Sequence, residues 1–211
     1  MRFLIKLGIL LNLVGFFGLF YWDGELKKES VKIESIKKQL PTEEQALEFF
    51  LKKYERKWSY KDKQTFLNTV RVASKHYNIE TFDLMTFVAL ESNYKIAPRP
   101  KTNRNGTFDY GLTQQNSNYY KGRYKIVSRV AKQYGLDYNI ENKFDITLNV
   151  LSCAYFVNSL KKEIRQKYDT TTHFQVVASY NTGIKGFYKN RKIAKQYYQT
   201  FMKLRSAVYN A

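Results

Sequence analysis

Apolar positions recur along most of the chain at helical spacing, and the alternation typical of strands is nearly absent. The stretch from Phe82 to Tyr94 is the most informative. In it, the positions i, i+3, i+4 and i+7 hold Leu84, Phe87, Val88 and Glu91. A carboxylate thus ends an otherwise apolar stripe, where partial shielding from water favours its protonated form. A carboxyl group that stays protonated near neutral pH can serve as a general acid.

The same periodicity predicts a mainly α-helical domain. We expect helices over residues 43–58, 62–77, 82–91, 117–134, 146–168 and 174–180, and a last helix opened by Asn190. Thr42 with Gln45, and Thr172 with Gln175, have the spacing of capping boxes. Thr81 and Asp145 are also placed to cap helices. The last helix should bury a stripe of Ile193, Tyr197, Phe201, Leu204 and Val208.

The first 22 residues have the pattern of a membrane segment. Arg2 and Lys6 precede an uncharged run from Leu7 to Trp22, which reaches the length of about 20 residues needed for a span if Lys6 snorkels. A cleaved signal peptide is the alternative, but residues 20–23 lack the small residues that cleavage prefers. We therefore favour an uncleaved inner-membrane anchor over residues 1–22, then a charged linker over 23–41 and an exported domain over 42–211.

The counts of charged residues, cysteine and histidine limit the partners and cofactors that the chain can have. The chain has 36 Lys and Arg against 18 Asp and Glu, a formal net charge of +18 that favours anionic surroundings such as nucleic acid, phospholipid or an acidic wall polymer. Cys153 is the single cysteine, so no internal disulfide forms, and its apolar neighbours indicate a small buried side chain. With only His76 and His173 besides, zinc spacing is absent, and we expect no metal or cofactor.

Three short motifs stand out beyond the helices. They read Glu91-Ser92-Asn93-Tyr94, Gly111-Leu112-Thr113-Gln114 and Ser179-Tyr180-Asn181-Thr182-Gly183. In this order they resemble the catalytic domain of lytic transglycosylases, among the lysozyme-like folds, whose pattern is Glu-Ser-x-Tyr/Phe, Gly-Leu-Met-Gln and Ala-Tyr-Asn-x-Gly. The resemblance covers about residues 65–205. Thr113 in place of methionine and Ser179 in place of alanine are departures from it.

A finer resemblance concerns one branch of that family. Residues 103–114, from Asn103 to Gln114, are similar to the loop of the enzymes associated with pilus, conjugation and secretion machines. Asp145 and Asn149 match that branch as well. The resemblance thus implies an assembly partner of this kind, although a phage or ordinary wall turnover stays open.

The resemblance also implies a reaction. The substrate would be the peptidoglycan glycan strand, and Glu91 would protonate the β-1,4 bond between N-acetylmuramic acid and N-acetylglucosamine. The same residue would then deprotonate the muramic acid 6-hydroxyl, which closes a 1,6-anhydro ring, so no second carboxylate is required. Asp109 is the nearby candidate for such a second carboxylate, but we expect it to cap the turn at Gly106.

Further roles follow from the same resemblance. Ser92 would pack or hydrogen-bond beside the catalytic carboxyl, and Gln114 would offer its amide to the sugar. Gly111 would let the backbone approach the sugar closely. Tyr180 and Asn181 would face the carboxyl across the cleft and orient it. An isolated Tyr180 could equally be a core aromatic.

Two other functions remain open. A lysozyme-type muramidase would use the same site and differ only in its product. A basic, membrane-tethered module that binds nucleic acid or assembly partners, with an inactive site, would explain the +18 charge. We disfavour nucleic acid as a partner, because anionic peptidoglycan peptides and phospholipid account for the charge equally well.

Overall fold

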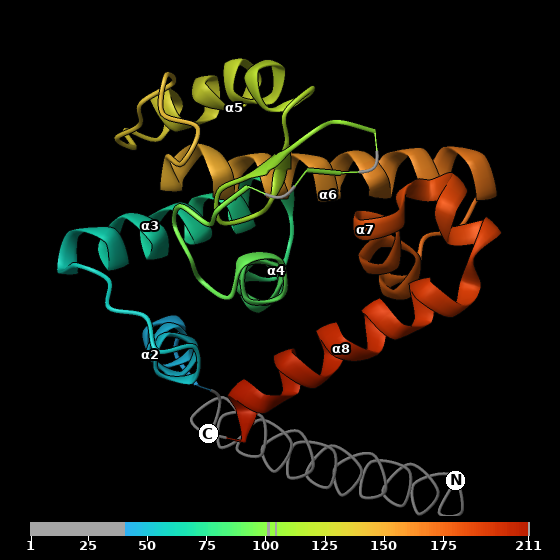
Figure 1. The fold of residues 1–211 in the computed structure, drawn as a ribbon, viewed down its shortest axis with the longest axis horizontal. Coiled ribbons are helices and arrows are strands. Elements are labelled where there is room, and N and C mark those ends of the chain that lie inside the picture. Colours follow the sequence, from blue (N-terminus) through green and yellow to red (C-terminus); the bar gives the residue numbers. More distant parts are fainter. Residues whose placement is uncertain (1–40, 101, 104, 211) are drawn as a thin grey trace, which may run out of the picture. The chain divides into compact units, whose positions relative to one another are not determined.

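The computed structural model describes residues 41–210 apart from 101 and 104 (Figure 1). The expected anchor or signal segment over 1–22 and nearly all of the linker over 23–41 lie outside the described residues. None of the helices in the described part is both long and apolar enough to cross a membrane.

The described part is mainly α-helical, as the sequence pattern predicted. It contains seven helices and one two-stranded antiparallel hairpin, which connects α4 to α5. In chain order they are α2 (Glu43–Lys53), α3 (Tyr60–Tyr77), α4 (Thr81–Ser92), β1 (Asp109–Tyr110), β2 (Gln115–Asn116), α5 (Tyr120–Gln133), α6 (Ile146–Tyr168), α7 (His173–Lys189) and α8 (Arg191–Tyr209).

Helix α4 lies at the centre of these elements. It contacts α2, α3, α6 and α8, and Figure 1 shows it end-on between them. Seven consecutive residues, from Asp83 to Ala89, are buried. The predicted single apolar stripe is therefore too narrow a description, because a helix surrounded by others is buried on all sides.

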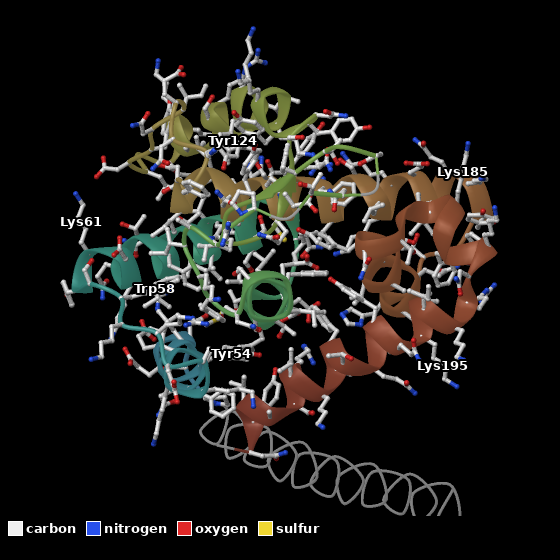
Figure 2. All side chains as sticks on the ribbon, in the orientation of Figure 1. Tyr54, Trp58, Lys61, Tyr124, Lys185 and Lys195 are labelled. Carbon is white, nitrogen blue, oxygen red and sulfur yellow. The ribbon has the colours of Figure 1, made fainter. Side chains whose placement is uncertain are left out.

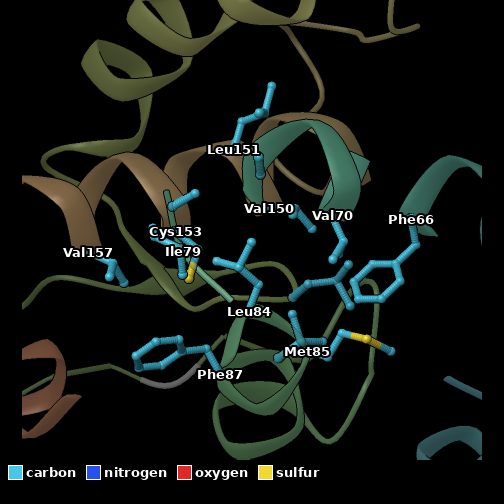
Figure 3. Packing of buried hydrophobic residues seen from close by; sticks show 14 of the residues in the cluster. Phe66, Val70, Ile79, Leu84, Met85, Phe87, Val150, Leu151, Cys153 and Val157 are labelled. Atoms are coloured by element: carbon cyan, nitrogen blue, oxygen red, sulfur yellow. The ribbon is translucent and has the colours of Figure 1, made fainter. Parts of the chain in front are cut away.

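Most charged side chains lie on the outside of the helices and apolar side chains lie between them. Lys61, Lys185 and Lys195 project outward from α3, α7 and α8 (Figure 2). Inside, Leu84 and Phe87 of α4 pack toward α6, near Cys153 and Val157 (Figure 3). Cys153 is a free buried thiol, as expected from its apolar neighbours.

Most predicted helix starts are confirmed at the level of individual hydrogen bonds. Both capping boxes form, at Thr42 and Thr172, and the side chains of Asp145 and Asn190 accept from backbone N–H groups of α6 and α8. The predicted cap at Thr81 is wrong: this residue is the first of α4, and no side chain caps that helix.

The largest differences from the predicted helix limits are at the ends of α2 and α7. The helix predicted over 43–58 ends at Lys53, and the one predicted over 174–180 continues to Lys189 through a kink at Gly183. Gly183 has φ 67° and ψ 162°, so the two halves of α7 change direction there. On α8, Tyr197, Phe201 and Val208 of the predicted stripe are buried, but Ile193 is 47% exposed.

Candidate active site

The three motifs meet at a cleft of about 640 Å³. One wall comes from the loop and hairpin before α5, the other from α7, and Glu91 at the end of α4 contributes to the lining. The lining residues are Glu91, Asn103, Asn105, Asp109, Gln114, Gln115, Asn116, Tyr119, Arg123, Phe156, Tyr180, Asn181, Thr182 and Gly183. Glu91, Asp109, Gln114, Tyr180 and Asn181 are thus brought together, as the sequence suggested.

Aromatic packing fixes the end of α4, where Glu91 lies. The chain leaves the helix through Asn93 and Tyr94, both with left-handed backbone angles (φ 50° and 59°). Tyr94 is fully buried, and its hydroxyl donates to the carbonyl of Met85 at 3.0 Å. Trp58 donates through Nε1 to the carbonyl of Tyr94, also at 3.0 Å. Because both bonds anchor this turn, the carboxyl of Glu91 has a defined position.

The environment of Glu91 raises its pKa from the usual value to about 7. Burial is the main cause, since it disfavours the charged carboxylate. The hydroxyl of Tyr197 opposes this shift by donating to Oε1 at 2.5 Å, and the negative charge of Asp109 adds to it. Glu91 can therefore hold its proton near neutral pH, as a general acid must.

Sequence reasoning assigned Tyr197 to the core and missed its contact with the candidate acid. Its ring is largely buried on the inner side of α8. Burial and the neighbouring Glu91 raise the pKa of Tyr197, so the phenol stays protonated and remains the donor. A tyrosine among apolar positions of a stripe was the available signal, because a buried hydroxyl requires a partner.

Asp109 does not cap the turn at Gly106, so that expectation was wrong. Its two carboxylate oxygens accept from the side-chain amides of Asn103 and Asn116, each at 3.0 Å. The turn is instead closed by the backbone N–H of Gly106, which donates to the carbonyl of Asn103 at 2.9 Å, and the side chain of Asn105 accepts from the backbone N–H of Thr107 at 3.2 Å. Asp109 is therefore a fixed negative charge in the cleft.

The second motif serves mainly to shape the hairpin. Gln114 lines the cleft, and its Nε2 donates to the carbonyl of Gly111 at 2.9 Å. Thr113 is buried, donates to the carbonyl of Asn149 at 3.0 Å and accepts from Nε2 of Gln115 at 2.8 Å. The threonine that replaces the family's methionine thus ties the hairpin to α6 through a hydrogen bond that a thioether could not donate.

Tyr180 joins α7 to the hairpin. Its ring lies 4.4 Å from that of Phe87 and 5.3 Å from that of Phe156, centroid to centroid. Its hydroxyl donates to the carbonyl of Thr113 at 3.0 Å. Tyr180 therefore packs as a core aromatic and also lines the cleft. The neighbouring Asn181 is exposed in the same wall.

Two predicted site residues do not line the cleft. Ser92 is buried and donates to the carbonyl of Val88 at 3.1 Å, within its own helix. Gly111 has φ 73°, and a Cβ atom built on it would lie 2.1 Å from Oδ1 of Asn149. The close approach at Gly111 is therefore to helix α6, whereas the sequence suggested an approach to the sugar.

Arg123 on α5 lines the cleft and was also missed by sequence reasoning. Its guanidinium Cζ lies 4.3 Å from the centroid of the Phe156 ring, and Nη1 donates to Oε1 of Gln115 at 2.7 Å. Burial lowers the pKa of Arg123. Among so many basic residues, no sequence signal distinguished it.

In the part of the chain that the structure describes, no three His, Cys, Asp or Glu side chains lie close enough to hold a metal ion. No protein-family model matches the chain, and a search of curated proteins gives no significant match. The site itself and the motif resemblance are therefore the features from which a function can be inferred.

Proposed function

We propose that the protein is a peptidoglycan lytic transglycosylase with Glu91 as general acid and base. The observation that carries the proposal is a carboxyl group with a pKa of about 7 in a cleft of about 640 Å³. All three motifs of the resemblance contribute to this cleft or to its frame. Its lining is rich in amide side chains with an aromatic wall, a composition suited to the hydroxyl, acetamido and ring faces of a sugar chain.

In the proposed reaction, protonated Glu91 gives its proton to the oxygen between N-acetylmuramic acid and N-acetylglucosamine. The bond from that oxygen to the anomeric carbon breaks, and positive charge develops on the muramic acid ring. The carboxylate of Glu91 then takes the proton of the 6-hydroxyl, whose oxygen attacks the anomeric carbon. This closes the 1,6-anhydro ring and returns Glu91 to its acid form, so water is not consumed.

The neighbours of Glu91 support this cycle. Tyr197 would hold the carboxyl in one orientation in both protonation states, because its hydroxyl donates to Oε1. The charge of Asp109 would stabilise the positively charged ring. Both oxygens of Asp109 accept from asparagine amides, which favours an electrostatic role over activation of water.

A muramidase is the second candidate, because Asp109 lines the same cleft as Glu91. An inverting hydrolase places a water between two such carboxyl groups, and this water would give a reducing end in place of the anhydro end. The two functions therefore predict products that differ by one water molecule.

Product analysis of the full-length protein on purified peptidoglycan tests both candidates. We expect anhydro ends by mass spectrometry and, for Glu91→Gln, a rate lower by about 10²-fold or more, since an amide cannot donate the proton. Glu80→Gln at the opposite, exposed end of α4 is the matched control and should keep full activity. Undiminished release by Glu91→Gln would exclude the proposed role, and reducing ends would identify a hydrolase.

We also propose where the protein acts in the cell. The segment over residues 1–22 would hold the domain at the periplasmic side of the inner membrane, within reach of the wall. Local opening of the wall for a secretion, pilus or phage assembly is the corresponding biological role.

A further inference from the structure

Arg123 is the only cation among the described residues that line the cleft. It lies in the first turns of α5, and two aromatic rings flank its guanidinium, with Cζ 4.3 Å from the centroid of Phe156 and 5.7 Å from that of Tyr119. Such flanking restricts the side chain and removes water from part of its surface. The group is therefore held in place, unlike the lysines that project from the surface.

Among the described residues, no carboxylate forms an ion pair with this cation. The two acids of the cleft are engaged elsewhere, Glu91 with Tyr197 and Asp109 with two asparagine amides. A guanidinium carries five N–H donors, and Gln115 accepts from one nitrogen only.

A half-buried cation without a counter-charge is costly, and here burial lowers the pKa of Arg123. Burial, Tyr197 and Asp109 account for the shifted pKa of Glu91, so Arg123 is not needed for the protonation of the acid. The guanidinium of Arg123 is therefore free to bind an anion in the cleft. The planar fork of arginine matches a carboxylate with two parallel hydrogen bonds.

We propose that Arg123 binds a carboxylate group of the substrate, and so makes the cleft prefer anionic glycan strands to neutral ones. This inference rests on the proposed function. Two parts of peptidoglycan carry such a group: the stem peptides, and the lactyl side chain of muramic acid once its peptide has been removed. The chemistry is the same in both cases, and substrates that differ in these parts distinguish them.

Binding of three ligands tests the inference on full-length protein that carries Glu91→Gln, so that strands are not cleaved. The ligands are peptide-bearing strands, peptide-free strands and a chito-oligosaccharide of equal length, which has no carboxylate. Addition of Arg123→Gln should raise Kd about tenfold or more for the strand with the recognised group, and leave Kd for chito-oligosaccharide unchanged. Arg129→Gln, an exposed position on the same helix, removes equal charge and should change none of them.

Each outcome has a distinct meaning. A loss confined to peptide-bearing strands assigns the stem peptide, a loss confined to peptide-free strands assigns the lactyl group, and a loss on both assigns both. An equal loss on all three ligands would show that Arg123 only shapes the cleft, and no loss would remove its role; both overturn the inference while the proposed function stands. If the parent protein bound no glycan at all, both proposals would fail. Unchanged thermal unfolding of Arg123→Gln verifies that the variant is folded.

Discussion

Burial, Asp109 and Tyr197 set the pKa of Glu91, and they do not all shift it in the same direction. Burial and the charge of Asp109 raise its pKa, whereas the hydrogen bond from Tyr197 lowers it, with a resulting value of about 7. The acid form starts the proposed reaction, so activity should be complete at low pH and should decline as the pH rises through about 7.

Removal of the Tyr197 hydroxyl should therefore move this decline to higher pH. In Tyr197→Phe the ring still packs against the core, but the bond that stabilises the carboxylate is lost, so the pKa of Glu91 increases. We also expect a lower kcat, because the carboxyl is less well oriented. The pH dependence of kcat/KM, measured from anhydro product release, checks both.

Two further variants test this prediction, one with an opposite expected shift and one as a control. Asp109→Asn removes a negative charge that raises the pKa of Glu91, so it should move the decline to lower pH. Tyr198→Phe, at the next position of α8, removes a hydroxyl that contacts His173 and not Glu91, and should leave the profile unchanged. Shifts in the same direction for the Tyr197 and Asp109 variants would contradict the assignment.

Among the elements, the hairpin depends on its close approach to α6. Gly111 faces the fully buried Asn149, whose Nδ2 donates to the hydroxyl of Tyr124 at 2.6 Å and to the carbonyl of Asp145 at 2.9 Å. Asn149 therefore has little freedom to move away from a larger side chain. The position of the hairpin, and with it the wall of the cleft that carries Gln114, follows from this contact.

Gly111→Ala should destabilise the protein and weaken glycan binding together. The added Cβ would lie 2.1 Å from Asn149 Oδ1, and the positive φ adds strain, for a total loss of about 2–4 kcal/mol in the free energy of unfolding. Gly106→Ala is the matched control, because Gly106 also has a positive φ but a Cβ added there would meet no atom within 4 Å. Denaturant unfolding of both measures the difference, and equal losses would assign the effect to backbone strain alone.

The other end of helix α4 is held by side-chain contacts of Asp83. Asp83, buried in the first turn, pairs with His173 of α7 at 2.9 Å and with Arg205 of α8 at 2.7 Å. The two ends of α4 are thus joined to distant parts of the chain, at Asp83 to α7 and α8 and at Tyr94 to Trp58. A helix held in this way can present Glu91 to the cleft with little movement.

At the scale of the whole molecule, basic charge dominates the C-terminal part. The chain after Asp169 contains no Asp or Glu, and its basic residues are Lys185, Lys189, Arg191, Lys192, Lys195, Lys203 and Arg205. All of them belong to α7 and α8, and all except Arg205, which pairs with Asp83, are exposed. One wall of the cleft also comes from α7, the helix that carries Lys185 and Lys189.

Binding to intact peptidoglycan should therefore weaken as salt increases. Exposed charges are screened within about 8 Å at physiological ionic strength, and more strongly at about 0.5 M salt. Sedimentation with purified wall measures the binding of the Glu91→Gln protein, which does not degrade the wall. Addition of Lys185→Gln and Lys195→Gln to this protein should make its binding less dependent on salt. Equal binding at about 0.05 M and about 0.5 M salt would exclude an electrostatic contribution.

Local patterns predicted much of the fold. The capping boxes at Thr42 and Thr172 and the cap at Asp145 formed as expected, because each depends on residues three positions apart. The prediction failed at Thr81, where no side chain caps the helix, and at Ile193, whose place on a stripe did not give it a partner to pack against. Helix periodicity identifies a face, but only the neighbouring elements decide whether that face is covered.

The sequence by itself determined the set of helices, the place of Glu91 at the end of one of them, and the motifs that pointed to its chemistry. These depend on residues that are close along the chain. Only the tertiary structure decided that Tyr197, 106 residues away, donates to Glu91, that Gly111 meets Asn149, and that Arg123 enters the same cleft. Burial and charge at a site are sums over all neighbours in space, and local spacing does not contain that sum.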